Sequence, residues 1–152
     1  MKRFITVVLA SLMLLSIASC GKKEEGTVPY TLIISCDEIL SNMDSETFGI
    51  KEEKKAIVPK DGKILEIPAK CGEGVNAFDL VVENLKAKKL HFEGVDGYFN
   101  GIANIYAGDC GQFSGWMFFI NGNLAELGAS DTIINSNDVV EFRYIVDYNT
   151  LF

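Results

Sequence analysis

The chain has 152 residues, of which 14 are basic and 21 acidic, so its formal net charge is −7. An acidic chain without a basic stripe argues against nucleic acid as a partner, because nucleic-acid binding depends on Lys and Arg clusters that neutralise phosphates. The length suits one domain with its own hydrophobic core.

The N-terminal segment is typical of an exported lipoprotein. Met1-Lys2-Arg3 is basic, and the apolar run Phe4–Leu15 is too short for a bilayer span, which takes about 20 residues. Ile17-Ala18-Ser19-Cys20 resembles the bacterial lipobox, so residues 1–19 are predicted to be a signal peptide and Cys20 the site of lipidation. The alternative is an ordinary signal peptide with Cys20 an incidental thiol. Lipidation would anchor the chain to the extracytoplasmic face of the cell membrane.

Cleavage before Cys20 would leave 133 residues with 12 basic and 21 acidic side chains, a formal charge of −9. The polar segment Gly21–Pro29 contains Gly and Pro and lacks apolar periodicity. Residues 20–29 are therefore predicted to be a lipidated cysteine and flexible tether, and residues 30–152 the folded domain.

Three further cysteines, Cys36, Cys71 and Cys110, allow at most one intrachain disulfide, whose pairing the spacing does not reveal. Zinc is not favoured because no two of them lie close in sequence and His91, the single histidine, is outside any metal-binding pattern. His91 is interpreted as a strand-surface residue.

The first half of the domain is predicted to hold two strands and a helix. Asn76 is a candidate N-cap, and Phe78, Val81, Val82 and Leu85 recur at helical spacing, which indicates an amphipathic helix over residues 76–88. The other expected elements are a strand at Tyr30–Ser35, a helical turn at Asp37–Met43, an exposed charged loop at Lys51–Lys55 and a strand at Lys63–Pro68.

The last third is β-rich by pattern, and Asn121-Gly122 is a strong hairpin signal. Strands are expected at His91–Phe92, Tyr98–Phe99, Ile102–Tyr106, Trp116–Ile120 and Val139–Val146. This order predicts an α+β fold of β-grasp type (ubiquitin-like or SLBB-like): a mixed sheet with one packed helix and extra β-hairpins. An α+β sandwich of another topology is the alternative.

The strand around Trp116, the single tryptophan, is apolar on both faces, because Trp116 and Phe118 point one way and Met117 and Phe119 the other. One explanation is purely structural: Trp116 and Phe118 face the helix, and the other pair lies under the 108–113 loop. The functional explanation leaves one face open as an apolar patch for a flat ligand, a protein or a glycan. The candidate ligand-binding residues are then Tyr106, Ser114, Trp116, Phe118 and Asn121.

Three segments resemble motifs of the transcobalamin-like C-terminal domain, the DUF4430 family of bacterial surface proteins: Glu38–Asp44, Ser114–Gly122 and Asn137–Tyr144. The resemblance spans Tyr30 to Asp147 and implies a β-grasp-like fold. In the animal vitamin B12 carriers of this type, the domain closes over cobalamin bound against a helical barrel. The family often has a cysteine where this chain has Ala129, so the resemblance implies that Cys110 has lost its usual partner.

Catalysis has little support in the sequence. Ser114 has no histidine near it in sequence, no phosphate-binding loop is present, and the acids Glu93, Asp96 and Asp109 are more often solvated than catalytic. The chain is therefore predicted not to be an enzyme and to need no metal or cofactor. Two functions remain: a lipid-anchored module that captures a corrinoid as half of a two-part site and passes it to a membrane transporter, or a structural, adhesive surface domain that docks onto another protein or the cell wall.

Overall fold

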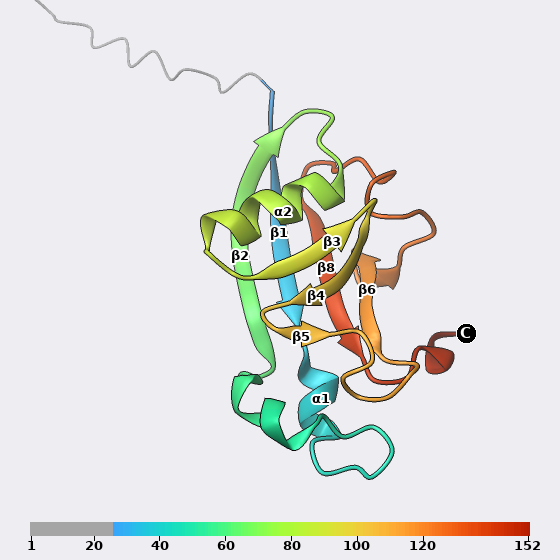
Figure 1. The fold of residues 1–152 in the computed structure, drawn as a ribbon. Coiled ribbons are helices and arrows are strands. Elements are labelled where there is room, and N and C mark those ends of the chain that lie inside the picture. Colours follow the sequence, from blue (N-terminus) through green and yellow to red (C-terminus); the bar gives the residue numbers. More distant parts are fainter. Residues whose placement is uncertain (1–25) are drawn as a thin grey trace, which may run out of the picture.

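Strands β1 (Thr27–Ser35) and β2 (Lys63–Gly72) form an antiparallel pair at one side of the main sheet (Figure 1). β1 alternates buried and less buried residues, with Leu32 and Ile34 fully buried on one face.

The computed structural model describes residues 26–152, so the predicted signal peptide and Cys20 lie outside the described residues. β1 begins at Thr27 rather than Tyr30, so Thr27–Pro29 belong to the sheet and not to the tether.

The chain continues through short helices and a second group of strands. The remaining elements are α1 (Asp37–Ser41), the 3₁₀ helix η1 (Glu52–Ile57), α2 (Ala77–Ala87), β3 (Phe92–Val95), β4 (Tyr98–Ile102), β5 (Ile105–Tyr106), β6 (Gly115–Ile120), β7 (Asn123–Leu124), β8 (Asp138–Ile145) and the 3₁₀ helix η2 (Tyr148–Leu151). None of the helices within residues 26–152 is long and apolar enough to cross a membrane.

The main sheet has the strand order β2-β1-β8-β6-β7 and is mixed, because β1 and β8 run parallel while the other neighbours are antiparallel. A smaller antiparallel sheet has the order β3-β4-β5. Figure 1 shows α2 and this small sheet lying across the same face of the main sheet. The predicted α+β, β-grasp-like fold with one packed helix and extra hairpins is thus confirmed.

Helix α2 begins where the sequence predicted. The Asn76 side chain accepts a hydrogen bond from the backbone N–H of Asp79 at 2.8 Å, which caps the first turn. Leu80, Val81 and Leu85 are buried on the face that meets the sheet. This face, with the facing side of β1 and β8, forms the hydrophobic core.

Three local predictions were wrong. Lys51–Lys55, expected as an exposed charged loop, lies mostly in η1, and β2 continues beyond Pro68 to Gly72. The expected strand Ile102–Tyr106 is divided into β4 and β5, because Ala103 and Asn104 both adopt positive φ (51° and 65°) and make a two-residue hairpin turn. Asn104 favours such a turn, whereas Ala103 gives no signal for it.

Candidate functional site

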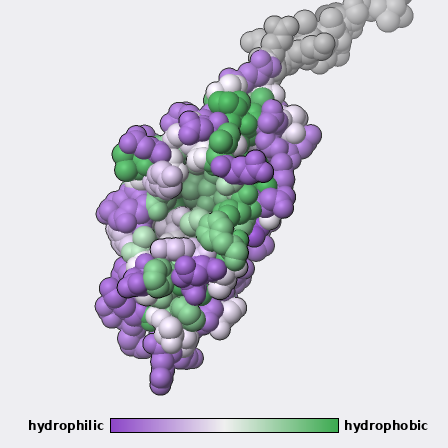
Figure 2. Space-filling view, turned by 90° about the vertical axis from the view of Figure 1, so that its right-hand side faces the viewer, coloured by the Kyte–Doolittle hydropathy of each residue, from purple (hydrophilic) through white to green (hydrophobic). Residues whose placement is uncertain are grey.

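An apolar groove of about 280 Å³ lies beside β6, on the side of the molecule that Figure 2 faces. Apolar surface surrounds a hollow in that view, with hydrophilic surface at its margins. Three segments supply most of its lining, namely the turn and start of β4, strand β6, and the end of β7 with the loop after it, and Phe142 and Phe152 complete it. The lining residues that the argument uses are Tyr98, Trp116, Phe118, Leu127 and Phe152.

Trp116 forms the floor of the groove and is only 7% exposed. Its indole Nε1 donates to the backbone carbonyl of Ile105 at 2.9 Å, and its ring meets Tyr144 edge-on with centroids 5.3 Å apart. Trp116 therefore packs under β5 and against β8. These contacts hold its ring in place as the floor of the groove.

Phe118 stacks on Phe142 with ring centroids 5.2 Å apart, and Phe142 in turn meets Phe99 edge-on at 4.9 Å. Phe99 completes the connection to helix α2 through Phe78, at 5.0 Å. The structural explanation from the sequence placed Phe118 directly against the helix, whereas Phe99 lies between them. Phe118 remains partly exposed and lines the groove.

The opposite face of β6 does not lie under the 108–113 loop, as the structural explanation supposed. Phe119 is 5% exposed, and the guanidinium of Arg143 covers its ring at 4.3 Å from the centroid. Phe119 is thus covered by protein, whereas Met117 is half-buried and lines the groove.

One edge of β6 also opens at the groove. Asn121 N–H donates to the Val139 carbonyl, so the odd-numbered residues of β6 bond to β8 and the backbone of Trp116 and Phe118 faces the β7 side. β7 ends at Leu124, and Ala125 N–H donates to the Phe118 carbonyl at 3.1 Å. Beyond this bond no described strand pairs with the edge. The N–H of Phe118 and the N–H and carbonyl of Trp116 therefore lack a strand partner in residues 26–152.

Ser114, another predicted ligand-binding residue, is 4% exposed and lies in a buried hydroxyl network. Its Oγ is 2.9 Å from the Tyr144 hydroxyl, accepts from the Cys110 backbone N–H at 3.1 Å and donates to the Gly111 carbonyl at 2.7 Å. The Tyr144 hydroxyl donates to the Tyr106 carbonyl at 2.8 Å. The Ser114 side chain is thus engaged in fastening the 106–114 loop to β8.

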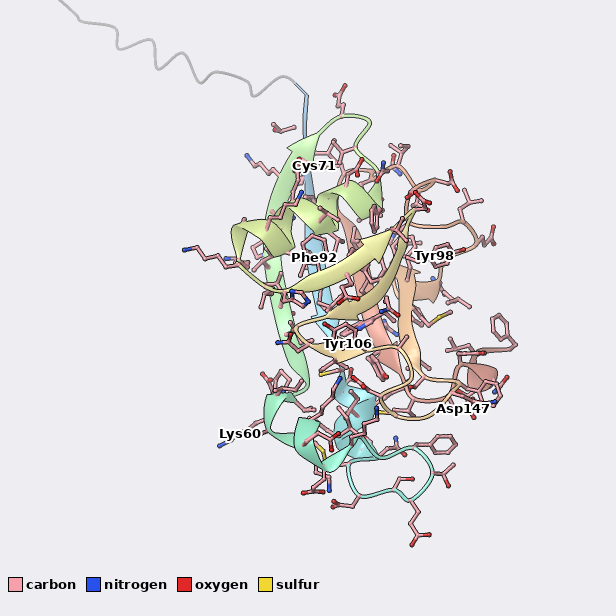
Figure 3. The ribbon with its side chains drawn as sticks, in the orientation of Figure 1. Lys60, Cys71, Phe92, Tyr98, Tyr106 and Asp147 are labelled. Carbon is pink, nitrogen blue, oxygen red and sulfur yellow. The ribbon has the colours of Figure 1, made fainter. Side chains whose placement is uncertain are left out.

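Tyr106 and Asn121, also predicted, lie outside the groove lining. Figure 3 shows Tyr106 at the front of the molecule, apart from Tyr98 at the right-hand edge. Tyr106 belongs to β5, and its ring lies against Gly101. The Lys54 ammonium is 4.7 Å from the centroid of this ring. Asn121 holds the β6–β7 hairpin turn with φ of 52°, and its Oδ1 accepts from Val139 N–H at 2.8 Å.

The three described cysteines are unpaired in the structure. Cys36 and Cys110 are fully buried, and burial raises the pKa of the Cys36 thiol to about 12 and that of Cys110 to about 11. Burial also raises the pKa of the less buried Cys71 thiol. These thiols are therefore neutral and packed at neutral pH. Within residues 26–152 no three His, Cys, Asp or Glu side chains gather as metal ligands.

The sequence reasoning missed Tyr98, Leu127 and Phe152, which are 73%, 60% and 90% exposed. Tyr98 lies in the expected strand Tyr98–Phe99 and Phe152 follows Leu151, but no periodic pattern connects these residues with β6. Asp96-Gly97, with φ of 50° and 89°, forms the hairpin turn that carries Tyr98, and this dipeptide was a signal for that turn.

Fold and groove together define a β-grasp-like α+β domain with an apolar groove open on one side. Residues 74–145 match the family model described as "Domain of unknown function (DUF4430)". The resemblance to this family that the motifs in Ser114–Gly122 and Asn137–Tyr144 predicted is thus confirmed over residues 74–145. The Glu38–Asp44 segment lies outside the match. None of the curated proteins matches the chain.

Two solved structures resemble the fold. Haptocorrin in complex with Cbi is 10% identical with a TM-score of 0.54, and the alignment covers 78% of this chain and 25% of haptocorrin. The chain thus spans about a quarter of that protein's length. A "putative metal binding protein" from Ruminococcus gnavus is 12% identical with a TM-score of 0.42, over 78% of this chain and 96% of that one. At these identities the likeness to haptocorrin establishes the fold alone.

Proposed function

We propose that this chain is a binding module, not an enzyme, whose groove captures a corrinoid or a similarly flat ligand as one half of a two-part site. Lipidated Cys20 would hold it on the extracytoplasmic face of the cell membrane, where it passes the ligand to a membrane transporter. The observation that carries the proposal is the apolar groove beside the unpaired edge of β6.

The groove suits such a ligand chemically. A corrinoid presents a flat macrocycle with carboxamide groups around its rim. Aromatic walls at Tyr98, Trp116 and Phe118 suit the flat part. The strand-unpaired N–H of Phe118 and carbonyl of Trp116 offer a donor and an acceptor, the combination that a primary amide needs. Haptocorrin, whose fold this domain shares, is known in complex with Cbi.

The size of the groove explains why the site is proposed as one half. Tight small-molecule sites commonly bury 70 to 90 percent of their ligand in pockets of about 300 to 1,000 Å³. A cavity of about 280 Å³ that opens on one side is too small to enclose a corrin ring. A second protein surface would therefore cover the exposed face of the ligand.

The test is a titration of residues 21–152, which contain every described element, with cobinamide and cobalamin. Trp116 is the single tryptophan and lines the groove, so saturable quenching of its fluorescence together with a change in the corrin visible spectrum is the expected result. Leu127→Ser should weaken binding about 5- to 30-fold, because burial of a leucine contributes about 1 to 2 kcal/mol. Ile133→Ser is the matched control, since Ile133 is 49% exposed outside the groove lining.

The membrane anchor is tested separately by labelling cells with a radioactive fatty acid. The wild-type protein should incorporate the label, and Cys20→Ser should not. A chain that binds no corrinoid but pulls down a surface protein through Tyr98 and Leu127 would instead favour the structural, adhesive function, which those exposed apolar side chains also suit.

A further inference from the structure

The groove is bordered by acidic side chains. Among the described residues that line it, Glu126 is the charged one. Asp96 precedes the lining residue Gly97, and a Cβ on Gly97 would stand 2.9 Å from the Ser130 hydroxyl, so this turn abuts the segment that carries Asp131. Asp96, Glu126 and Asp131 are all exposed, and none of them forms an ion pair within residues 26–152.

Basic side chains are absent from this part of the sequence almost entirely. Between residues 90 and 152 the chain has eight acidic residues and a single Lys or Arg, which is Arg143. Arg143 Nε donates to Glu141 Oε2 at 2.9 Å, and its guanidinium covers Phe119. Arg143 lies opposite Met117, which also lines the groove, but its charge is already balanced by the ion pair with Glu141, so it does not compensate the acidic border of the groove.

Aromatic walls add to the same preference. The face of an aromatic ring is electron-rich and attracts cations, and the attraction is stronger where water is partly excluded. Tyr98, Phe118 and Phe152 all line the groove. Aromatic rings in the lining and carboxylates at the border are the two elements that favour a positively charged flat ligand over a negatively charged one of the same shape.

We infer that the groove selects flat ligands that carry a net positive charge, and that Asp96, Glu126 and Asp131 determine this specificity. The inference rests on the proposed function only in assigning the ligand to the same groove. It narrows the ligand class: a cationic corrinoid or another planar cation should bind, whereas a flat anion should be rejected.

The experiment compares two tricyclic dyes with residues 21–152 at low salt, proflavine as the cation and anthracene-9-carboxylate as the anion, each followed by quenching of Trp116. Proflavine should bind saturably and roughly tenfold more tightly than the anion. Three carboxylates near the ligand each contribute about a twofold difference at the high effective dielectric of a surface site. The preference should fall as salt is added.

Two triple variants show whether the preference for the cation comes from the carboxylates at the groove or from the negative net charge of the whole chain. Asp96→Asn/Glu126→Gln/Asp131→Asn should abolish the roughly tenfold preference. Glu46→Gln/Glu53→Gln/Glu73→Gln changes the net charge equally at exposed sites outside the groove lining and should keep it. Equal affinities for the two dyes, no saturable binding of either, or the same loss in both triple variants would overturn the inference.

The corrinoid titration distinguishes this inference from the proposed function. If cobinamide and cobalamin do not bind but proflavine is preferred and the groove triple variant loses the preference, the corrinoid assignment fails and the charge selection stands. If a corrinoid binds and the dyes show no charge preference, the corrinoid assignment stands and the charge selection fails.

Discussion

Replacing Tyr144 by Phe removes one buried hydroxyl and keeps the ring that packs on Trp116. The Tyr144 hydroxyl donates its proton to the Tyr106 carbonyl, and the Ser114 hydroxyl donates its proton to the Gly111 carbonyl. With both protons used in this way, none is left for the contact between the two hydroxyls. Without the Tyr144 hydroxyl, Ser114 can still donate to Gly111, and the Tyr106 carbonyl still accepts from the Asp109 N–H at 3.0 Å. The expected loss is therefore at the low end for a buried hydrogen bond, about 1 to 2 kcal/mol.

Ser114→Ala should cost more than Tyr144→Phe. The Ser114 Oγ accepts from the buried backbone N–H of Cys110 at 3.1 Å, and Ser114→Ala removes this acceptor together with the donor to the Gly111 carbonyl. An unsatisfied buried donor costs about 1 to 3 kcal/mol, whereas a lost contact between two groups that keep other partners costs less. The two residues share one network, so the double variant should be less destabilised than the sum of the single variants.

Urea denaturation and thermal melting followed by circular dichroism measure these losses, and 1 kcal/mol should lower Tm by about 3 to 6 °C for a domain of this size. Tyr98→Phe is the matched control, because Tyr98 is 73% exposed and loss of its hydroxyl should change stability by less than about 0.5 kcal/mol. The reasoning is refuted if Ser114→Ala is as stable as the wild type while it weakens ligand binding, since Ser114 would then be a ligand contact.

Three further predictions concern a buried ion pair and the thiols. Lys54→Met should destabilise the fold by about 1 to 3 kcal/mol, because Asp109 is buried and Lys54 Nζ lies 2.6 Å from its Oδ2. This expected loss is smaller than for a fully buried ion pair, since the Lys54 side chain is 24% exposed. An unchanged urea midpoint would contradict the prediction. The contribution of the thiols to stability should be constant below about pH 8.5, where they are protonated in both states. Above that pH, stability should fall as the unfolded chain's thiols ionise while folded Cys36 and Cys110 stay neutral up to about pH 12 and 11. Iodoacetamide at pH 8 should accordingly modify Cys71 first, as mass spectrometry of the digested protein would show; faster reaction at Cys110 would contradict the burial argument.

Features that depend on neighbouring residues in the sequence were predictable. The N-cap at Asn76 and the hairpin turn at Asn121-Gly122 follow from side-chain chemistry that acts within three residues. The order of strands and helix restricted the fold class, because one helix among many strands leaves few ways to bury a single core. The turn at Ala103-Asn104 escaped prediction, since contacts elsewhere hold Ala103 at positive φ against its own preference.

The candidate site was only half predictable. Trp116 and Phe118 stand out in the sequence because they lie in an apolar strand. Tyr98, Leu127 and Phe152 join them through tertiary structure, from segments that have no common sequence pattern. Ser114 was among the predicted ligand-binding residues, but its hydroxyl fastens the 106–114 loop to β8. A motif can therefore identify the region of a site while its individual side chains serve the fold.

The open edge of β6 is where the fold departs from the most stable arrangement of its strands. β7 pairs for two residues, and the chain then turns away after Ala125 and is fixed at the Ala129 carbonyl, which accepts from Phe78 N–H at 3.1 Å. A longer β7 would cover Trp116 and satisfy its backbone groups, at the expense of the groove. Extending β7 by design along residues 125–127 should thus stabilise the domain and abolish binding of flat ligands together, because the same backbone groups cannot serve a strand and a ligand at once.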